Sequence, residues 1–317
     1  MNEDIKKKID EYISGHHYRQ INSVLIMKDN EILAKCYYNG FNERSKNEIC
    51  SVAKSIMSVC AGIALDKGLI VSLDEPVYKY IHEFSECREP LHRMITIRHL
   101  LTMTSGIYWN GGVHYHCPMM KQLRSSGDWI SHIADCAVSD IPGTKYNYKE
   151  WDVILLGKLL DSVCGDMYDF INENIFRPLE IESDRWYKSP CGVYYSVGNG
   201  QDDDNNDNKT KFKMTAADML KIGQLFLNGG RFKEKHIISQ NYINQAVSPL
   251  ICNPNIPVPY YGFLWWVWED QYGCRGYGGQ SITVVPHENA VIVTQATPTE
   301  RGMGYFDVVE YCRELLL

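Results

Sequence analysis

The stretch Ser51-Val-Ala-Lys-Ser-Ile-Met-Ser-Val-Cys-Ala-Gly-Ile-Ala-Leu-Asp-Lys-Gly68 carries the strongest information about the fold of this chain. Its residues are apolar on nearly every side of a helix, and Gly68 is a residue type that ends helices. The pattern therefore predicts a helix that is buried all round, with other elements packed on each of its faces.

A serine and a lysine open this helix one turn apart. Residues at i and i+3 share a face, so the Ser51 hydroxyl and the Lys54 amine can touch. A lysine in so apolar a helix is at least partly buried, and burial favours a neutral amine that can take the serine proton. The Ser51 backbone N–H also faces a developing oxyanion. About one S-x-x-K is expected by chance in a chain this long, so spacing alone favours a surface lysine, and it is the apolar helix that favours the buried one.

The remaining patterns place strands at both ends of the chain and helices between them. Isoleucines recur every fourth residue in the first helix, at Ile5, Ile9 and Ile13, and strand-like residues 23–27 and 32–38 flank a turn at 28–31. Further helices are predicted at 97–103, 129–136, 151–163, 167–175, 216–227 and 306–316, and strands at 262–268, 281–285 and 290–295. We expect an α+β fold in which residues 1–75 and 236–317 form one sheet domain and residues 76–235 form a mostly helical subdomain.

Composition excludes several classes of protein. The 317 residues include 32 Lys and Arg against 39 Asp and Glu, a net charge of −7, and mild acidity argues against a nucleic-acid partner. No stretch approaches the roughly 18 apolar residues of a membrane span. The amino-terminal segment has no apolar secretory core, and the 11 cysteines are scattered without CxxC pairs, so we expect reduced thiols and a cytoplasmic location. The oligomeric state stays open.

Three other segments invite a functional interpretation. His114-Tyr115-His116-Cys117 contains zinc-ligand types, but three ligands so close rarely complete a tetrahedron, so we expect no metal there. Residues 202–208, DDDNNDN, lack the glycine and distal glutamate of a calcium loop and predict a solvated surface loop. Tyr108 and Trp109, after the Ser105-Gly106 turn, are candidates for the wall of a pocket.

Several segments, taken in order, resemble the serine β-lactamase-like family over nearly the whole chain, from Ile21 to about Val293. This family includes class C β-lactamases, D-alanyl-D-alanine carboxypeptidases, family VIII esterases and 6-aminohexanoate-dimer hydrolases. The resemblance implies a β-lactamase/transpeptidase-like fold with an antiparallel sheet flanked by helices. The matching segments are ICSVAKSIMSVCAGIALDKGLIVSLDEPVYKYI, ITIRHLLTMTSGI, IPGTKYNYKEWDVILLGKLLDSVCG, MTAADMLKIGQLFLNGGRF, YGFLWWVWED and GYGGQSITVVPHENAVIV.

The resemblance also implies roles for individual residues. Ser51 is the acylated nucleophile and Lys54 its base partner, while Tyr148 lies on the second family motif, Y-x-N, and passes a proton between Ser51 and the leaving group. The third motif, K/H-T/S-G, maps onto Tyr277-Gly278-Gly279, with Gln280 supplying the second oxyanion N–H. A bulge or a tight turn is the alternative interpretation of these glycines.

Two positions depart from the family pattern. Glu150 replaces the motif asparagine, and it would favour a charged Lys54 and weaken it as a base unless it points away or shares protons in the site. Tyr277 stands where penicillin-recognising enzymes carry Lys or His. Both departures argue against β-lactam hydrolysis. The GYGGQ form and the WWVW segment look more like the esterase and 6-aminohexanoate-dimer hydrolase branch.

We therefore expect a serine hydrolase that cleaves a small-molecule ester, amide or peptide-like substrate through an acyl-Ser51 intermediate. No cofactor is expected, because Ser51, Lys54, Tyr148 and two N–H groups supply nucleophile, base and oxyanion hole. One alternative is a β-lactamase or D-alanyl-D-alanine carboxypeptidase. Another, for which Glu150 is the best support, is a catalytically silent member that binds a ligand.

Overall fold

A central antiparallel sheet organises the computed structural model, which describes residues 1–86, 89–111, 117–186, 188–195, 212–253, 258–299, 302 and 304–316. Within that part of the chain the sheet has eight strands in the order β2-β1-β12-β11-β10-β9-β8-β7. Because β1 pairs with β12, the sheet is built from both ends of the chain, as predicted. Its strands are β1 (Ile21–Lys28), β2 (Glu31–Tyr37), β7 (Ile251–Cys252), β8 (Tyr260–Tyr261), β9 (Trp266–Val267), β10 (Tyr272–Gly276), β11 (Gln280–Val285) and β12 (Ala290–Ala296).

The predicted hairpin at the start of the sheet is present between β1 and β2. Its two central residues, Asp29 and Asn30, have φ angles of 52° and 61°. Positive φ at both positions is the requirement of a type I′ turn, whose twist matches that of the paired strands. Asp and Asn tolerate this conformation better than most residues, which is why the turn could be predicted from the sequence.

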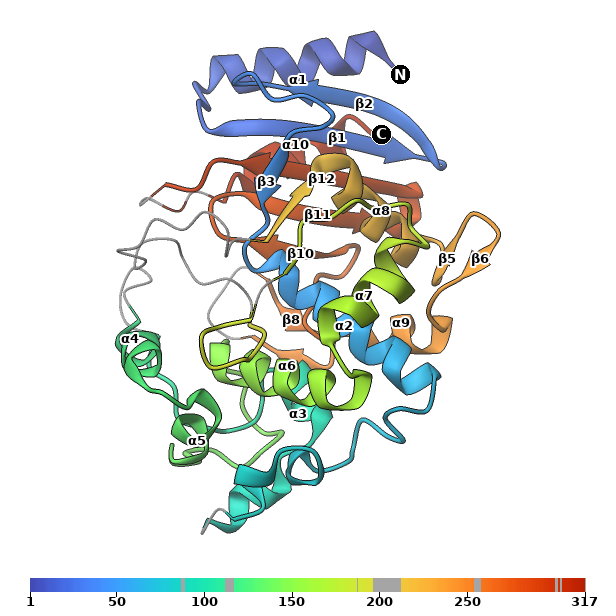
Figure 1. Cartoon of the computed structure of the whole chain (residues 1–317). Coiled ribbons are helices and arrows are strands. Elements are labelled where there is room, and N and C mark those ends of the chain that lie inside the picture. Colours follow the sequence, from blue (N-terminus) through green and yellow to red (C-terminus); the bar gives the residue numbers. More distant parts are fainter. Residues whose placement is uncertain are drawn as a thin grey trace.

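Helices cover both faces of the sheet. On one face lie α1 (Glu3–Gly15) and α10 (Phe306–Glu314), and on the other α2 (Val52–Asp66) and α8 (Ala216–Leu227). The side chains of β1 point alternately to the two faces of the sheet. Val24 and Ile26 pack with α1 and α10 on one face, and Leu25 and Met27 pack with α2 on the other. Figure 1 shows α1 lying along β1 and β2, with both chain ends at that end of the molecule.

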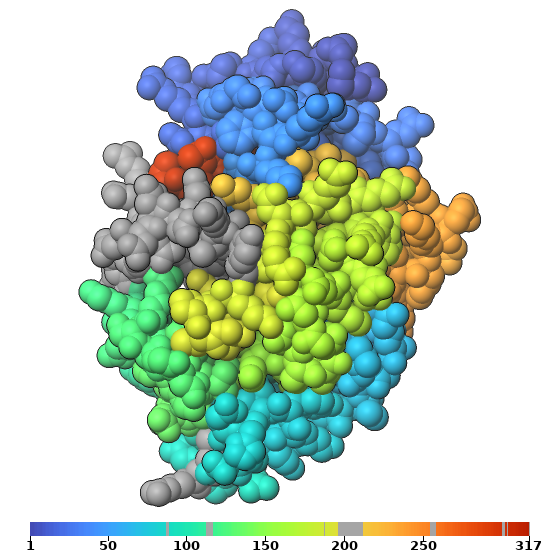
Figure 2. Space-filling view, in the orientation of Figure 1, coloured from blue at the N-terminus to red at the C-terminus, as the bar shows by residue number. Residues whose placement is uncertain are grey.

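The middle of the chain supplies a helical layer over the outer side of α2. Every residue from Val52 to Ala64 is buried, which confirms the prediction of a helix enclosed on all sides. The helices of this layer are α3 (Ile97–Leu101), α4 (Pro118–Ser125), α5 (Trp129–Ala134), α6 (Glu150–Cys164) and α7 (Met167–Ile171), with a π-helical turn at Asn172–Phe176 and 3₁₀ turns at Val77–Lys79, His82–Phe84 and Pro90–Met94. From later in the chain, α9 (Gln240–Ala246) also packs on α2, and a 3₁₀ turn at Pro286–Glu288 connects β11 to β12. Figure 2 shows the segments of both layers packed into one body.

One predicted strand is wrong. Residues 262–268 were expected to form a single strand, but only Trp266–Val267 are in the sheet as β9. The preceding residues turn, with Leu264 at a φ of 61° and a hydrogen bond from Gly262 N to Trp265 O. Phe263 N donates to Ala246 O and Leu264 N to Leu101 O, so the ends of α9 and α3 take the hydrogen bonds that a sheet neighbour would have received.

Two short strand pairs stand apart from the main sheet. β3 (Lys46–Glu48) pairs with β4 (Lys213–Thr215), and β5 (Arg231–Phe232) pairs with β6 (Lys235–His236). Helix α8 follows β4 and packs on β11 and β12, although the expected division of the chain placed residues 216–227 in the helical subdomain. The boundaries at residues 75 and 235 stay a prediction.

Some of the other predictions concern residues that the structure describes, and some concern residues that it does not. The ten described cysteines are free thiols. Residues 202–208 and His114 to His116 lie outside the described part of the chain. None of the helices in the described ranges is both long enough and apolar enough to cross a bilayer.

The contact of α8 with the sheet generates a stability prediction. A Cβ at Gly223 would lie 2.4 Å from Val291 Cγ1 and 2.8 Å from Ile282 Cγ2. Gly223→Leu should therefore lower the free energy of unfolding by about 1–3 kcal/mol or more through overpacking. Gln224→Leu, one residue along at the partly exposed side of α8, should change it by about 0.5 kcal/mol or less. Equal urea midpoints for both variants would contradict the close approach of α8 to the sheet.

Candidate active site

The segment before α2 is held in a strained turn at the edge of the core. Cys50 has a φ of 50°, in the left-handed region, which costs a non-glycine residue about 1 kcal/mol or more. β3 anchors this segment on one side, and Ile49 N donates to Phe212 O. On the other side, a Cβ at Gly276 would lie 2.4 Å from Ile49 O, so the end of β10 presses directly on the residues that lead into Ser51.

Ser51 and Lys54 meet as the sequence predicts. Lys54 N donates to Ser51 O across the first turn of α2, and Lys54 Nζ lies 3.0 Å from Ser51 Oγ. Lys54 is 1% exposed, which confirms its expected burial. Ser51 is only partly buried at the start of the helix. The hydroxyl therefore lies at the boundary of the core, with the amine behind it.

Glu150 points at Lys54. The Glu150 Oε1 to Lys54 Nζ distance is 2.6 Å, and the carboxylate comes from the first residue of α6. Of the two alternatives left open by the sequence, the one in which Glu150 points away is therefore wrong. Lys54 Nζ lies within hydrogen-bond distance of both Ser51 Oγ and Glu150 Oε1.

Tyr148 completes this group within a set of aromatic rings. Lys54 Nζ lies 5.1 Å from the centroid of the Tyr148 ring, in cation–π range. Trp266 stacks on Tyr148 with 5.6 Å between ring centroids, and Tyr261 meets Tyr148 edge-on at 6.4 Å. Tyr146 packs on Tyr261 at 5.1 Å. The aromatic set of Tyr146, Tyr148, Tyr261 and Trp266 thus forms an apolar wall beside Lys54.

Electrostatics at this site favour a charged lysine and a protonated tyrosine. Burial lowers the pKa of Lys54, but the charges of Glu150 and Tyr148 and their hydrogen bonds raise it by more, so the pKa lies above the usual value. Burial raises the pKa of Tyr148 more than Lys54 and the hydrogen bond to Ser51 lower it. The contact with Glu150 therefore favours a charged amine at Lys54, whereas burial alone favours the neutral amine expected from the sequence.

The third predicted motif is the turn between β10 and β11. Gly278 and Gly279 have φ angles of 78° and 97°, and a Cβ on them would lie 2.6 Å from Pro298 Cα and 2.5 Å from the Tyr305 ring. These glycines are therefore required by contacts within the chain. The Tyr277 hydroxyl donates to Thr299 O at 2.6 Å, which binds the side chain to the loop after β12.

Gln280 follows that turn as the first residue of β11, paired with Gly276. Its side chain is fully buried, with Nε2 donating to Ala296 O at 2.6 Å and Oε1 accepting from Asn47 Nδ2 at 3.0 Å. Only the backbone of Gln280 is thus left to contribute to an oxyanion hole. Its partner Gly276 contacts Ile49 and Cys50, which places this part of β11 in the neighbourhood of Ser51.

The two predicted pocket residues after the Ser105-Gly106 turn differ in their surroundings. Trp109 packs edge-on against Trp151 with 4.8 Å between ring centroids, and Trp151 follows Glu150 directly in α6. Tyr108 is 49% exposed. Cys117 begins α4, where its sulfur accepts from Met120 N at 3.4 Å, so this thiol serves as a helix cap.

A buried polar cluster behind the site was missed by the sequence analysis. Lys149 is 1% exposed and Asp152 is fully buried. Ser105 Oγ joins them, donating to Asp152 Oδ1 at 2.5 Å and accepting from Lys149 Nζ at 3.3 Å, and Lys149 Nζ also donates to Ile107 O at 3.0 Å. The cluster fixes the backbone between Tyr148 and Glu150. The available signal was the aspartate next to the apolar run that follows it in α6, with a lysine just before the helix.

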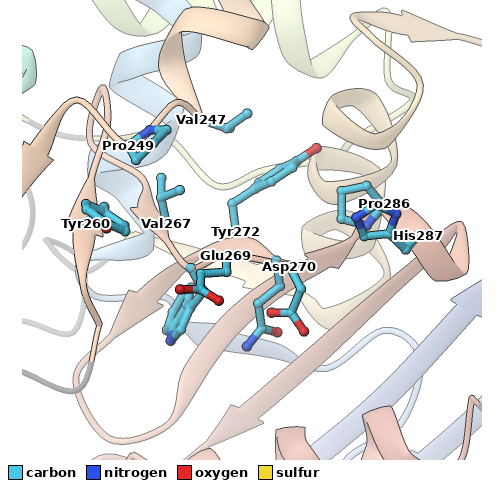
Figure 3. A pocket seen from close by; sticks show the side chains of 11 residues that line it. Val247, Pro249, Tyr260, Val267, Glu269, Asp270, Tyr272, Pro286 and His287 are labelled. Atoms are coloured by element: carbon cyan, nitrogen blue, oxygen red, sulfur yellow. The ribbon is translucent and has the colours of Figure 1, made fainter.

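A separate hollow lies at the far end of β10. It has a volume of about 380 Å³ and is lined by residues that include Tyr272, Val267, Glu269 and Pro286. Figure 3 shows lining side chains on several segments, with Val247 and Pro249 on one side of Tyr272 and with Pro286 and His287 on the other. Tyr272 is the first residue of β10 and Gly276 the last, so this hollow lies away from Ser51.

An antiparallel sheet between helices, with a serine and lysine one turn apart at the start of a buried helix, defines the class of β-lactamase-like and penicillin-binding-like proteins. The family model described as Beta-lactamase matches residues 9–304, and the chain belongs to this family of serine hydrolases. It is similar to an uncharacterized protein of Alkalihalophilus pseudofirmus, with 24% identity over 308 residues covering 86% of this chain and 82% of that protein.

Two further similarities are to a hydrolase sequence and to a solved structure. The 6-aminohexanoate-dimer hydrolase of Paenarthrobacter ureafaciens is 21% identical over 292 residues, which cover 85% of this chain and 70% of that protein. The penicillin binding protein from Bacillus halodurans superposes with a TM-score of 0.75 at 17% identity, covering 97% of this chain and 99% of that one. The expected β-lactamase/transpeptidase-like fold is confirmed.

The buried cluster generates a second stability prediction. Asp152→Ala leaves the interior ammonium of Lys149 without its nearby anion, so the free energy of unfolding should fall by about 3–5 kcal/mol. Asp135→Ala, an exposed position at the end of α5, should change it by about 0.5 kcal/mol or less. Chemical denaturation followed by circular dichroism measures both. An Asp152→Ala protein as stable as the parent would show that Lys149 needs no anion.

Proposed function

We propose that this protein hydrolyses an ester or amide bond through an acyl-Ser51 intermediate. The observation that carries the proposal is the 3.0 Å contact of Lys54 Nζ with Ser51 Oγ at the start of α2, with Tyr148 alongside. A nucleophile within hydrogen-bond reach of a proton-accepting partner, itself held by a third group, is the general arrangement of covalent catalysis.

The reaction proceeds in two halves. Ser51 Oγ gives up its proton toward Lys54 Nζ and attacks the acyl carbon of the substrate. The carbonyl electron pair moves to the carbonyl oxygen. The backbone N–H groups of Ser51 and Gln280 are our candidates to stabilise that oxyanion. Tyr148 donates the proton that the leaving group takes as it departs. Water then attacks the acyl-serine by the same steps, releasing the acid and restoring the Ser51 hydroxyl.

Neutral small esters and amides fit this site better than β-lactams. A β-lactam carries a carboxylate, and the family position that would meet it with a cation holds Tyr277, whose hydroxyl is bonded to Thr299 O. Arg275, two residues earlier, lies between the rings of Trp268 and Phe306 at 5.3 Å from each, on the α10 side of the sheet. A relative named for hydrolysis of the 6-aminohexanoate dimer supports an amide or ester substrate.

The rival proposal is a silent member that only binds its ligand. Its support is the Glu150 contact, which keeps Lys54 charged. The joint presence of Ser51, Lys54 and Tyr148 in one contacting group favours catalysis, because ligand binding alone requires none of the three together. We also propose that the protein works in the cytoplasm, which the ten free thiols support.

Labelling of the serine tests the proposed intermediate. A fluorophosphonate probe should add one adduct mass to the protein, and Ser51→Ala should abolish the adduct and lower ester turnover by about 10³-fold or more. Ser55→Ala is the matched control, because this next serine of α2 is buried and donates to Leu264 O at 2.7 Å. Intact mass spectrometry gives the result. Unlabelled parent protein would favour the silent binder, and a labelled Ser51→Ala variant would place the nucleophile elsewhere.

Substrate preference follows from the Tyr277 position. A charge-assisted hydrogen bond to a substrate carboxylate is worth about 1.5–3 kcal/mol, and a deficit of about 2 kcal/mol reduces kcat/KM by about 30-fold. We expect p-nitrophenyl butyrate to be hydrolysed with a higher kcat/KM than a chromogenic cephalosporin. Tyr277→Lys should reduce the ratio of kcat/KM for the ester to kcat/KM for the cephalosporin, because it supplies the missing cation. A higher kcat/KM for the cephalosporin in the parent enzyme would contradict the ester preference and support the β-lactamase alternative.

A further inference from the structure

The position of Glu150 gives the site a proton acceptor that the family motif lacks. Its Oε1 lies 2.6 Å from Lys54 Nζ, and the same Nζ lies 3.0 Å from Ser51 Oγ. These three groups form a continuous hydrogen-bonded line from the nucleophile through the ammonium to the carboxylate. An asparagine at this position could orient the lysine, but its amide could not take a proton at ordinary pH.

We propose that Glu150 is the final proton acceptor when Ser51 attacks, with Lys54 as the relay between them. This inference rests on the proposed function and adds to it the group that holds the proton. It explains how the site activates a serine although its resting lysine is charged.

The proton balance of the step is complete. As Ser51 Oγ forms its bond to the acyl carbon, its proton passes to Lys54 Nζ, and Lys54 passes one of its own protons to Glu150 Oε1. The carbonyl electron pair becomes the oxyanion. Before the step the site holds an ammonium and a carboxylate, and after it an ammonium, a carboxylic acid and the anionic tetrahedral intermediate. Collapse expels the leaving group, which takes a proton from Tyr148, and Glu150 returns its proton through Lys54 to Tyr148.

Burial makes this transfer feasible. The Lys54 side chain is 2% exposed and that of Glu150 is 17% exposed, so water competes weakly for either charge. Ion pairs lose much of their hydration in such surroundings, which brings the neutral pair closer in free energy to the charged pair. Trp151, directly after Glu150 in α6, is fully buried and anchors that end of the helix.

Other titratable groups around Glu150 come from four elements. Lys54 approaches from α2 and Tyr148 from the loop before α6, Tyr261 comes from β8, and Cys117 from the start of α4. Burial is the largest cause that raises the pKa of Tyr261 and of Cys117, and the charge of Glu150 adds to it. Both groups therefore stay protonated in the acid range and do not change their charge there.

His132 is a further group on the α5 side. Its ring lies 6.1 Å from that of Trp151. A His132→Gln variant tests whether this side chain contributes to the pH profile. Under the relay, this variant labels Ser51 at the same rates as the parent protein.

The deciding experiment is the rate of fluorophosphonate labelling at Ser51, measured from pH 5 to pH 10 in the parent, Glu150→Gln and Glu150→Asp. Under the relay, Glu150→Gln slows labelling at neutral pH by about 10²- to 10⁴-fold, and the rate recovers toward high pH as Lys54 itself loses its proton. Glu150→Asp, which keeps a carboxylate, labels faster at neutral pH than Glu150→Gln and slower than the parent. Glu173→Gln, an exposed glutamate in the π-helical turn, is the matched control and labels like the parent.

The opposite result has a distinct signature. If Lys54 acts alone, Glu150→Gln removes the charge that raises the lysine pKa, so the acid limb moves to lower pH and labelling at neutral pH is equal or faster. That outcome overturns the relay while leaving acyl-Ser51 chemistry in place. If Glu150→Gln never labels, Glu150→Asp decides, and an Asp variant that is folded but inactive also overturns it. A parent protein that never labels refutes the proposed function itself.

Discussion

The contact between Lys54 and Glu150 is the interaction on which the arrangement of the site depends. Lys54 comes from the first turn of α2 and Glu150 from the first residue of α6, and 2.6 Å separates their charged atoms. An ammonium 1% exposed cannot stay charged in the core without a compensating anion. The pair therefore fixes the start of α6 against the start of α2. Because Tyr148 precedes Glu150 by two residues, the same constraint brings the tyrosine beside the lysine.

The burial of α2 explains why the nucleophile lies where it does. Ser55 and Ser58 inside the helix are covered, and their oxygens bond to Leu264 O and to Tyr242, which tie α2 to the turn before β9 and to α9. Ser51, at the start of the helix, is partly exposed, unlike these two serines, and the left-handed Cys50 makes the sharp turn that places it there. Packing thus supplies a rigid base, and the strained entry exposes a single hydroxyl.

Local chemistry made much of this structure predictable, whereas side-chain direction did not follow from sequence. The turn at Asp29 and Asn30 and the end of α2 at Gly68 depend on residues that tolerate positive φ, so their sequence signals are strong. The aromatic run that includes Trp265 suggested one strand, but bonds from distant helix ends outweighed β-propensity there. The inward turn of Lys149 toward Ser105 depends on tertiary contacts 44 residues apart, which no local pattern encodes.

With Glu150 in place of the motif asparagine, Lys54 has a neighbouring group that can accept a proton from it. In water, moving a proton from a lysine to a glutamate is uphill by about 6 pKa units, or about 8 kcal/mol. Removing both groups from water penalises the charged pair and narrows that gap. The rings of Tyr148, Tyr261 and Trp266 pack against one another beside the Lys54–Glu150 pair and reduce its contact with water. The aromatic wall and the carboxylate therefore act together, because a relay through Lys54 requires both an acceptor and surroundings in which the neutral pair is accessible.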